Sequence, residues 1–197
     1  RNVSSTIYVL DPVSHNFGSY IANSGLPGTN NASNVISSGQ AFFVVAGTTS
    51  TSTLTFTESA KTTTAMNTGS NLLMGKALNT ANVQYLRLRM AKDAVNADET
   101  IIQFNSNGSL NYNANLDATY RAGYGAVSLA GLSSDKVQLS VNVIPLPKQQ
   151  PEVINLAVNA NATGIYSITL RDLIAVPKLY EVWLMDSFRK DSLDMRQ

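Results

Sequence analysis

The chain of 197 residues contains no cysteine, one histidine and one tryptophan. Without cysteine it can form no disulfide, no thiolate metal site and no cysteine nucleophile. Charged residues make up only 14% of the chain and the net charge is +1. There is no basic run and no arginine–aromatic cluster, so the electrostatic footprint of a nucleic-acid-binding protein is missing. We therefore expect no nucleic-acid partner.

Long hydrophobic runs are also missing. No stretch approaches the roughly 20 apolar residues that cross a bilayer as a helix, so no transmembrane segment is predicted. Residues 1–6 lack the apolar core of a signal peptide, and we expect either a mature chain after processing or a fragment of a longer protein. No segment longer than about ten residues has the 3.6-residue period of an amphipathic helix.

Short strand patterns fill the chain instead. Ala41–Ala46 is a continuous apolar run after a glycine, which favours a strand covered on both faces. Leu54–Thr57 alternates apolar and polar residues, as a half-buried strand does. The most regular alternation is Val137–Val143, and Pro145 follows it. Many short strands separated by turn signals predict an all-β fold, an antiparallel sandwich of the jelly-roll or immunoglobulin-like type.

The chain is predicted to form two structural units joined by one linker. Lys61–Asn71 is rich in threonine, asparagine and glycine and is the best candidate linker. We therefore predict two stacked sandwich units, residues 1–79 and 80–197. Early in the second unit, Arg87 and Arg89 alternate with leucines and are expected on the face opposite the core.

An ordered series of short motifs runs along nearly the whole chain. It comprises Ile7–Pro12, Ser38–Val44, Leu54–Glu58, Leu86–Leu88, Asp98–Phe104, Leu116–Ala118, Val143–Pro145, Leu156, Gly164–Thr169 and Leu184–Asp186. In its order the series resembles the region that precedes the sorting domain in large surface proteins of the Bacteroidota, the cargo of the type IX secretion system. The resemblance implies export across the outer membrane to the cell surface or the extracellular space, and no particular reaction. It also implies a first unit incomplete at its N-terminus and a second unit without its final strands.

Carboxylates offer one route to a metal site. Asp93, Asp98 and Glu99 flank a single predicted turn, and oxygen ligands of this kind suit Ca²⁺. The spacing does not fit an EF-hand loop. The alternative is that these acids cap turns and keep sheet edges soluble. We favour that alternative, and so expect no metal and no other cofactor.

Two aromatic residues are candidates for stacking on carbohydrate. Trp183 and Tyr85 each alternate with the residues expected in the core, which would place their rings on the outer face, where they can pack on a sugar. For Trp183 we favour the alternative, which is burial between the sheets of a sandwich.

Two further residues carry weaker signals. His15 lies in a predicted hairpin loop without a nucleophile elbow anywhere in the chain, and we expect an exposed loop histidine. The sequence Asp191-Ser192-Leu193 resembles the O-glycosylation sequon of the Bacteroidota, which marks Ser192 as a candidate modification site.

These observations favour a non-enzymatic structural or adhesive module of a secreted or surface-displayed bacterial protein. Its expected partners are neighbouring domains or other proteins that contact loops and sheet edges. The main alternative is a carbohydrate-binding module of a secreted polysaccharide-degrading enzyme. A hydrolase that uses loop carboxylates would need two acids converging in one cleft.

Overall fold

The computed structural model describes residues 2–47, 51–62 and 83–196. These residues form β structure with one short 3-10 helix, η1 (Glu58–Ala60), and include no helix long and apolar enough to cross a membrane. The strands are β1 (Val3–Leu10), β2 (Phe17–Ile21), β3 (Phe43–Ala46), β4 (Gln84–Ala91), β5 (Ala97–Phe104), β6 (Ala118–Thr119), β7 (Val127–Leu132), β8 (Gln138–Ile144), β9 (Asn155–Ala160), β10 (Ser167–Ile174), β11 (Trp183–Asp186) and β12 (Asp191–Asp194). The predicted all-β fold is confirmed.

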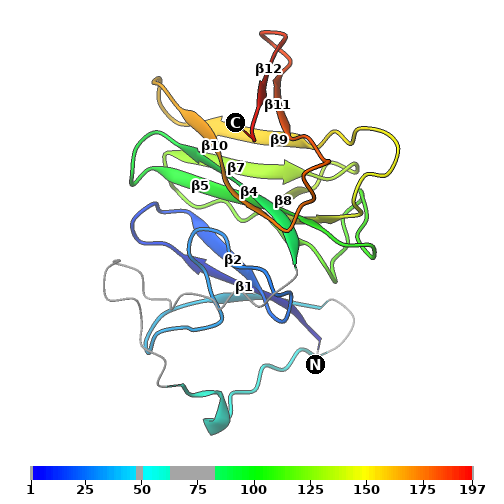
Figure 1. Ribbon diagram of the computed structural model, residues 1–197. Helices are drawn as coiled ribbons and strands as arrows, with labels where there is room; N and C mark the ends of the chain where they lie inside the picture. Colours follow the sequence, from blue (N-terminus) through cyan, green and yellow to red (C-terminus); the bar gives the residue numbers. More distant parts are fainter. Residues whose placement is uncertain (1, 48–50, 63–82, 197) are drawn as a thin grey trace.

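The first sheet is a three-stranded antiparallel sheet in the order β2-β1-β3, seen in the lower half of Figure 1. A short turn joins β1 to β2. In it, the Asp11 carboxylate accepts hydrogen bonds from Val13 N and Ser14 Oγ, both at 2.9 Å. His15 follows with a positive φ of 59°. A carboxylate that bonds to the backbone two residues ahead stabilises such turns, so the local sequence fixes this hairpin.

The second sheet has seven strands in the order β10-β4-β5-β8-β7-β9, with β6 paired to β8. All its pairs are antiparallel except β5–β8, which is parallel. The chain between β5 and β8 passes through β6 and β7, which gives it the length that a parallel return needs. The sheet curls into a half-barrel. β11 and β12 form a separate hairpin that projects from it (Figure 1).

A hydrophobic core lies between the two sheets. Ile21 and Leu26 from the first sheet and its following loop pack with Tyr85, Ile101 and Val141 of the second. The predicted units, 1–79 and 80–197, therefore contact one another through a shared core. The predicted linker, Lys61–Asn71, lies almost wholly outside the described residues, as does the boundary between the predicted units.

A second core fills the inside of the curled sheet. Its buried members are Leu86, Leu88, Met90, Ile102, Val127, Leu129 and Ile144. The predicted alternation in β4 is confirmed here, since its leucines and methionine share this core. Val182 and Met195, at the base of the C-terminal hairpin, pack against the same cluster. The hairpin is thus held at its base by apolar contacts.

One sequence-based strand prediction is confirmed only in part, and a second is wrong. The run Ala41–Ala46 contains β3, but among the described residues β3 pairs only with β1, at the edge of the first sheet, and Phe43 and Val45 are exposed rather than covered on both faces. Leu54–Thr57 forms no strand, and Leu54 and Phe56 are also exposed. An apolar run or an alternating pattern does not show whether a second layer covers it, and here these side chains lie at the surface.

Candidate functional site

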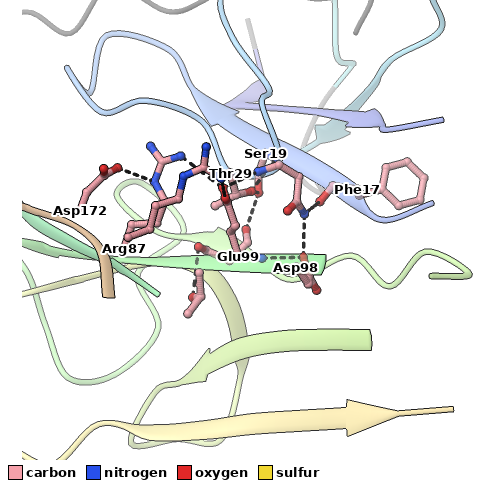
Figure 2. A network of polar contacts seen from close by, with 11 residues as sticks. Phe17, Ser19, Thr29, Arg87, Asp98, Glu99 and Asp172 are labelled. Atoms are coloured by element: carbon pink, nitrogen blue, oxygen red, sulfur yellow. Dashed lines mark hydrogen bonds and ion pairs between the residues drawn. The ribbon is translucent and has the colours of Figure 1, made fainter. Parts of the chain in front are cut away.

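Buried polar side chains gather where the first sheet meets the second. We call this group the polar seam, and it comprises Asn16, Ser19, Thr29, Asn30, Asp98, Glu99 and Ser140. Figure 2 shows part of it between β2, with its following loop, and β5. All of its members are buried. Buried polar groups destabilise a fold unless they are hydrogen-bonded, so the contacts of the seam decide what it does.

Asparagine and serine side chains on the β2 side reach across the seam. Asn16 Nδ2 donates to Ala97 O and to Val127 O, each at 3.0 Å. Ser19 Oγ donates to Ser140 Oγ at 2.6 Å. These bonds link residues more than eighty positions apart in the chain. They therefore hold the two sheets in one relative position.

Asp98 is the most fully satisfied member of the seam, with 0% of its surface exposed. Its carboxylate accepts hydrogen bonds from Asn30 Nδ2 (2.6 Å), Tyr120 Oη (2.7 Å), Leu129 N (2.9 Å) and Glu99 N (2.9 Å). Burial raises the pKa of Asp98, and these bonds oppose the rise because they favour the charged form. Burial, together with the neighbouring Asp98 charge, also raises the pKa of the Tyr120 hydroxyl.

Glu99 binds two arginines on the other side of the same strand. Its Oε2 lies 3.2 Å from Arg87 Nη1 and accepts from Asn30 N at 3.1 Å, and its Oε1 pairs with Arg171. Arg87 Nε also lies 2.9 Å from Asp172 Oδ2, as an ion pair without hydrogen-bond geometry. Two carboxylates thus face two guanidinium groups, and the local charges balance.

The geometry of the seam favours a structural role. Both oxygens of Asp98 and both oxygens of Glu99 are bound within the protein. A general acid or base needs a carboxyl group within reach of a substrate proton, whereas these groups point into contacts between β strands and the loop after β2. The hydrogen bonds of these carboxylates fix the position of the first sheet relative to the second.

The structure does not bring the three candidate calcium ligands together. Asp93 is exposed in the β4–β5 turn, where it accepts from Asn96 N (2.8 Å) and Val95 N (2.9 Å). Those bonds lower the pKa of Asp93. Asp98 and Glu99 are engaged in the seam instead. Across the described ranges of the chain, no group of three or more histidine, cysteine, aspartate or glutamate side chains could hold a metal ion.

The two aromatic candidates have different fates. Tyr85 is only 2% exposed and belongs to the core between the sheets. Its predicted role in glycan stacking is therefore wrong, because the first sheet covers the face that was expected to be open. Trp183 is 50% exposed on β11, and its indole Nε1 donates to Glu181 Oε2 at 3.0 Å. The favoured burial of Trp183 between two sheets is therefore wrong, because β11 belongs to a separate hairpin. Its ring is accessible, and glycan stacking by Trp183 stays a prediction.

The two weaker candidates lie on the surface. His15 is exposed, as expected, and its ring stacks on that of Tyr124 at a centroid distance of 4.6 Å. Ser192 is exposed on β12, and its N–H donates to Asp191 Oδ1 at 2.8 Å. The hydroxyl of Ser192 is accessible to a modifying enzyme, and its glycosylation stays a prediction.

Sequence reasoning missed the asparagines and the arginine of this region. Asn30 lies in a stretch that reads as an ordinary Asn- and Gly-rich loop, and yet it is buried and binds both Asp98 and Glu99. Arg87 lies on the face opposite the leucines of β4, as predicted, but that face is covered. The signal that could have found the seam is the pair of adjacent acids, Asp98-Glu99, shortly before the apolar pair Ile101-Ile102.

The second notable surface is the C-terminal hairpin, β11–β12. Its turn residue Phe188 is 95% exposed, and Met185 and Leu193 on its strands are also exposed. Leu179, just before the hairpin, is 89% exposed. Large apolar side chains gathered on one projecting element mark a contact surface, in contrast to the seam.

Comparisons with known proteins give one finding. A family model described as a domain of unknown function (DUF8693) matches residues 2–197. No curated protein and no solved structure matches the chain.

Proposed function

We propose that this chain, which belongs to the DUF8693 family, is a non-enzymatic structural or adhesive module of a bacterial protein. One observation carries the proposal, namely that the charged groups of the polar seam are buried and bonded within the chain, whereas large apolar side chains are exposed on the C-terminal hairpin. Asp98 and Glu99 are buried and fully bonded within the polar seam, while Phe188 and Met185 are exposed on the C-terminal hairpin. A rigid body with an adhesive projection fits a role in display and contact.

The seam supports rigidity in this role. Hydrogen bonds are directional, so a buried network with every member bonded favours one arrangement of the sheets over its alternatives. Contacts such as Ser19–Ser140 and Asn30–Asp98 hold the first sheet against the second. A module that must transmit or resist force at a cell surface benefits from such a fixed joint.

Export through the type IX secretion system is the second part of the proposal. Its support is the ordered series of motifs from Ile7–Pro12 to Leu184–Asp186, which resembles the region before the sorting domain in cargo proteins of that system. The proposed location is the cell surface or the extracellular space.

Surface labelling of the source bacterium tests the proposal. An antibody against this chain should label intact cells or detect the protein in the medium, and both signals should be lost in a strain without a functional type IX translocon. A control antibody against a cytoplasmic protein should label only permeabilised cells. Labelling of the chain only after permeabilisation would refute surface display.

A second candidate function is carbohydrate binding, and the accessible ring of Trp183 beside Glu181 favours it. An exposed indole with an adjacent carboxylate offers an apolar face and an acceptor for sugar hydroxyls. A glycan array with the purified chain tests this function. Binding should be lost in Trp183→Ala and kept in Phe188→Ala, which removes an exposed ring from the same hairpin. Equal loss in both variants would point to protein–protein contact instead.

A further inference from the structure

The outer edge of β11 carries unpaired backbone groups. Within residues 2–47, 51–62 and 83–196, β11 pairs only with β12, and each strand has four residues. Beyond the ladder, Met195 N donates to Val182 O at 2.8 Å. Alternate residues of an antiparallel strand direct their N–H and C=O groups to the same side. The groups of Trp183 and Met185 therefore point away from β12, toward the open edge.

The hairpin needs a further partner on physical grounds. Two short strands on their own are marginally stable in water, and a third strand or a covering layer is usually required. Apolar contacts hold only the base of the hairpin, at Val182 and Met195. Trp183 and Met185 share one face of β11, since they are two residues apart, and both are exposed. The open edge thus combines free backbone groups with apolar side chains.

We propose that a second copy of this chain pairs with β11 in antiparallel orientation, around a two-fold axis at Leu184. In this register Trp183 lies opposite Met185 of the second copy, and the two residues exchange both backbone N–H···O bonds. A thioether beside an indole is a favourable contact. The same patch serves both copies, as a closed two-fold interface requires. This inference rests on the proposed structural role and names the partner of its sheet edge.

Charge selects β11 rather than β12 as the paired edge. β12 carries two acids among its four residues, Asp191 and Asp194, so an antiparallel copy would bring four carboxylates into one short ladder, and crowding of like charges is unfavourable. β11 has an acid only at its last position, Asp186, which falls outside the central pairs.

The same register also provides contacts for the tip of the hairpin. It carries the turn of one copy toward the residues that precede β11 in the other. Phe188 then approaches Leu179 of the second copy, and these two side chains are 95% and 89% exposed in the single chain. Arg189 likewise approaches Glu181 of the second copy, a pair of opposite charges. The alignment therefore covers the apolar residues that a single chain leaves in water.

Cross-linking tests the register directly, because the chain has no cysteine of its own. Opposed residues at a position without hydrogen bonds have Cα atoms about 4.5 Å apart, within the range for a disulfide. Leu184→Cys should therefore form a covalent dimer under mild oxidation. Ser192→Cys, on the exposed face of β12, is the matched control and should stay monomeric. Cross-linking of Ser192→Cys as readily as Leu184→Cys would overturn the proposal.

Sedimentation equilibrium gives a second measurement that does not depend on replacing Leu184. The full 197-residue chain should dimerise, and Met185→Lys should raise the dissociation constant at least about tenfold, which is about 1.4 kcal/mol. Ile165→Lys, at a residue 92% exposed outside the hairpin, should leave it unchanged. A monomer at all concentrations, or a dimer indifferent to Met185→Lys, would overturn the inference. A monomer that still labels at the surface of intact cells would leave the proposed function standing.

Discussion

The polar seam and the C-terminal hairpin distribute their side chains in opposite ways. In the seam, Asp98 and Glu99 are buried and bonded. In the hairpin, Met185 and Phe188 extend into solvent. Burial of charge is unfavourable unless every group is paired, and exposure of large apolar side chains is unfavourable unless something covers them. The first requirement is met within the chain, and the proposed second copy would meet the second.

This difference indicates that the polar seam maintains the fold and that the C-terminal hairpin is available for contacts with other molecules. Removing a seam residue leaves buried donors without acceptors, so its effect is expected in the free energy of unfolding. Removing a hairpin residue takes away surface that the folded chain does not use, so its effect is expected in association. Three substitutions of buried acids, Asp98→Ala, Glu99→Gln and Asp117→Asn, each compared with an exposed residue, test whether buried polar groups govern stability.

Asp98→Ala should have the largest effect. It removes the shared acceptor of Asn30, Tyr120 and Leu129. An unsatisfied buried donor costs about 1–3 kcal/mol, so we expect the free energy of unfolding to fall by about 3–5 kcal/mol. Urea unfolding followed by circular dichroism measures this fall.

Two controls sharpen the comparison with the hairpin. Phe188→Ala removes a far larger side chain, but one that is 95% exposed, and the urea midpoint of the monomer, measured on dilute protein, should not change. Asp93→Ala removes an exposed carboxylate that bonds within the β4–β5 turn, and it should lower the midpoint far less than Asp98→Ala does. A loss of stability in Phe188→Ala as large as that in Asp98→Ala would contradict the division between the two regions.

Glu99→Gln should have an intermediate effect. It leaves Arg87 buried with only Asp172 as a counter-charge. Breaking a buried ion pair costs about 3–5 kcal/mol. We expect about 2 kcal/mol here, because the remaining carboxylate and the glutamine oxygen compensate in part. Glu58→Gln is the control, since its pair with Lys61 is solvent-exposed, and pairs of that kind contribute little. If both substitutions lowered the free energy of unfolding equally, the buried ion pair would contribute no more to stability than the exposed one.

The sequence predicted the strands of the second sheet better than their surroundings. The two-residue alternation of β4 and β8 is visible in the chain because each strand has one strongly apolar side. It cannot show which layer covers the other side. For that reason Tyr85 was expected in solvent, and it is buried.

The asparagines of the polar seam could not be predicted from the sequence, for a related physical reason. Asn16 and Asn30 contact groups more than sixty residues away in the chain. No local pattern encodes such a pairing, and asparagine in a loop usually indicates only a turn. By contrast, the sequence shows that Trp183 and Leu184 lie on opposite faces, because strand geometry alone sets this alternation. Local sequence patterns thus predict which side chains share a face of a strand, and tertiary contacts decide which of the two faces is exposed to solvent.

The smallest effect is expected in the pH dependence of stability, at two acids near β6 and β8. Asp117 accepts from Val143 N (2.8 Å) and Asn113 N (2.7 Å), and burial raises its pKa above the ordinary 3.8. Asp135 is exposed, and hydrogen bonds from Ser133 Oγ (2.6 Å) and a backbone N–H lower its pKa. The two acids should therefore act on stability with opposite signs.

For Asp117, the folded chain binds the proton more tightly than the unfolded chain does. Its contribution is most favourable below pH 3.8 and is lost as the pH rises through the raised pKa. For Asp135, the contribution is present above pH 3.8 and is lost as the pH falls through the lowered pKa. Urea unfolding at about pH 4 and about pH 7 measures this difference. On going from about pH 7 to about pH 4, the free energy of unfolding of the unaltered chain should rise relative to that of Asp117→Asn and fall relative to that of Asp135→Asn. If both differences in the free energy of unfolding changed in the same direction with pH, burial would not govern the titration of Asp117. The contrast between buried and exposed acids would then not hold for this pair.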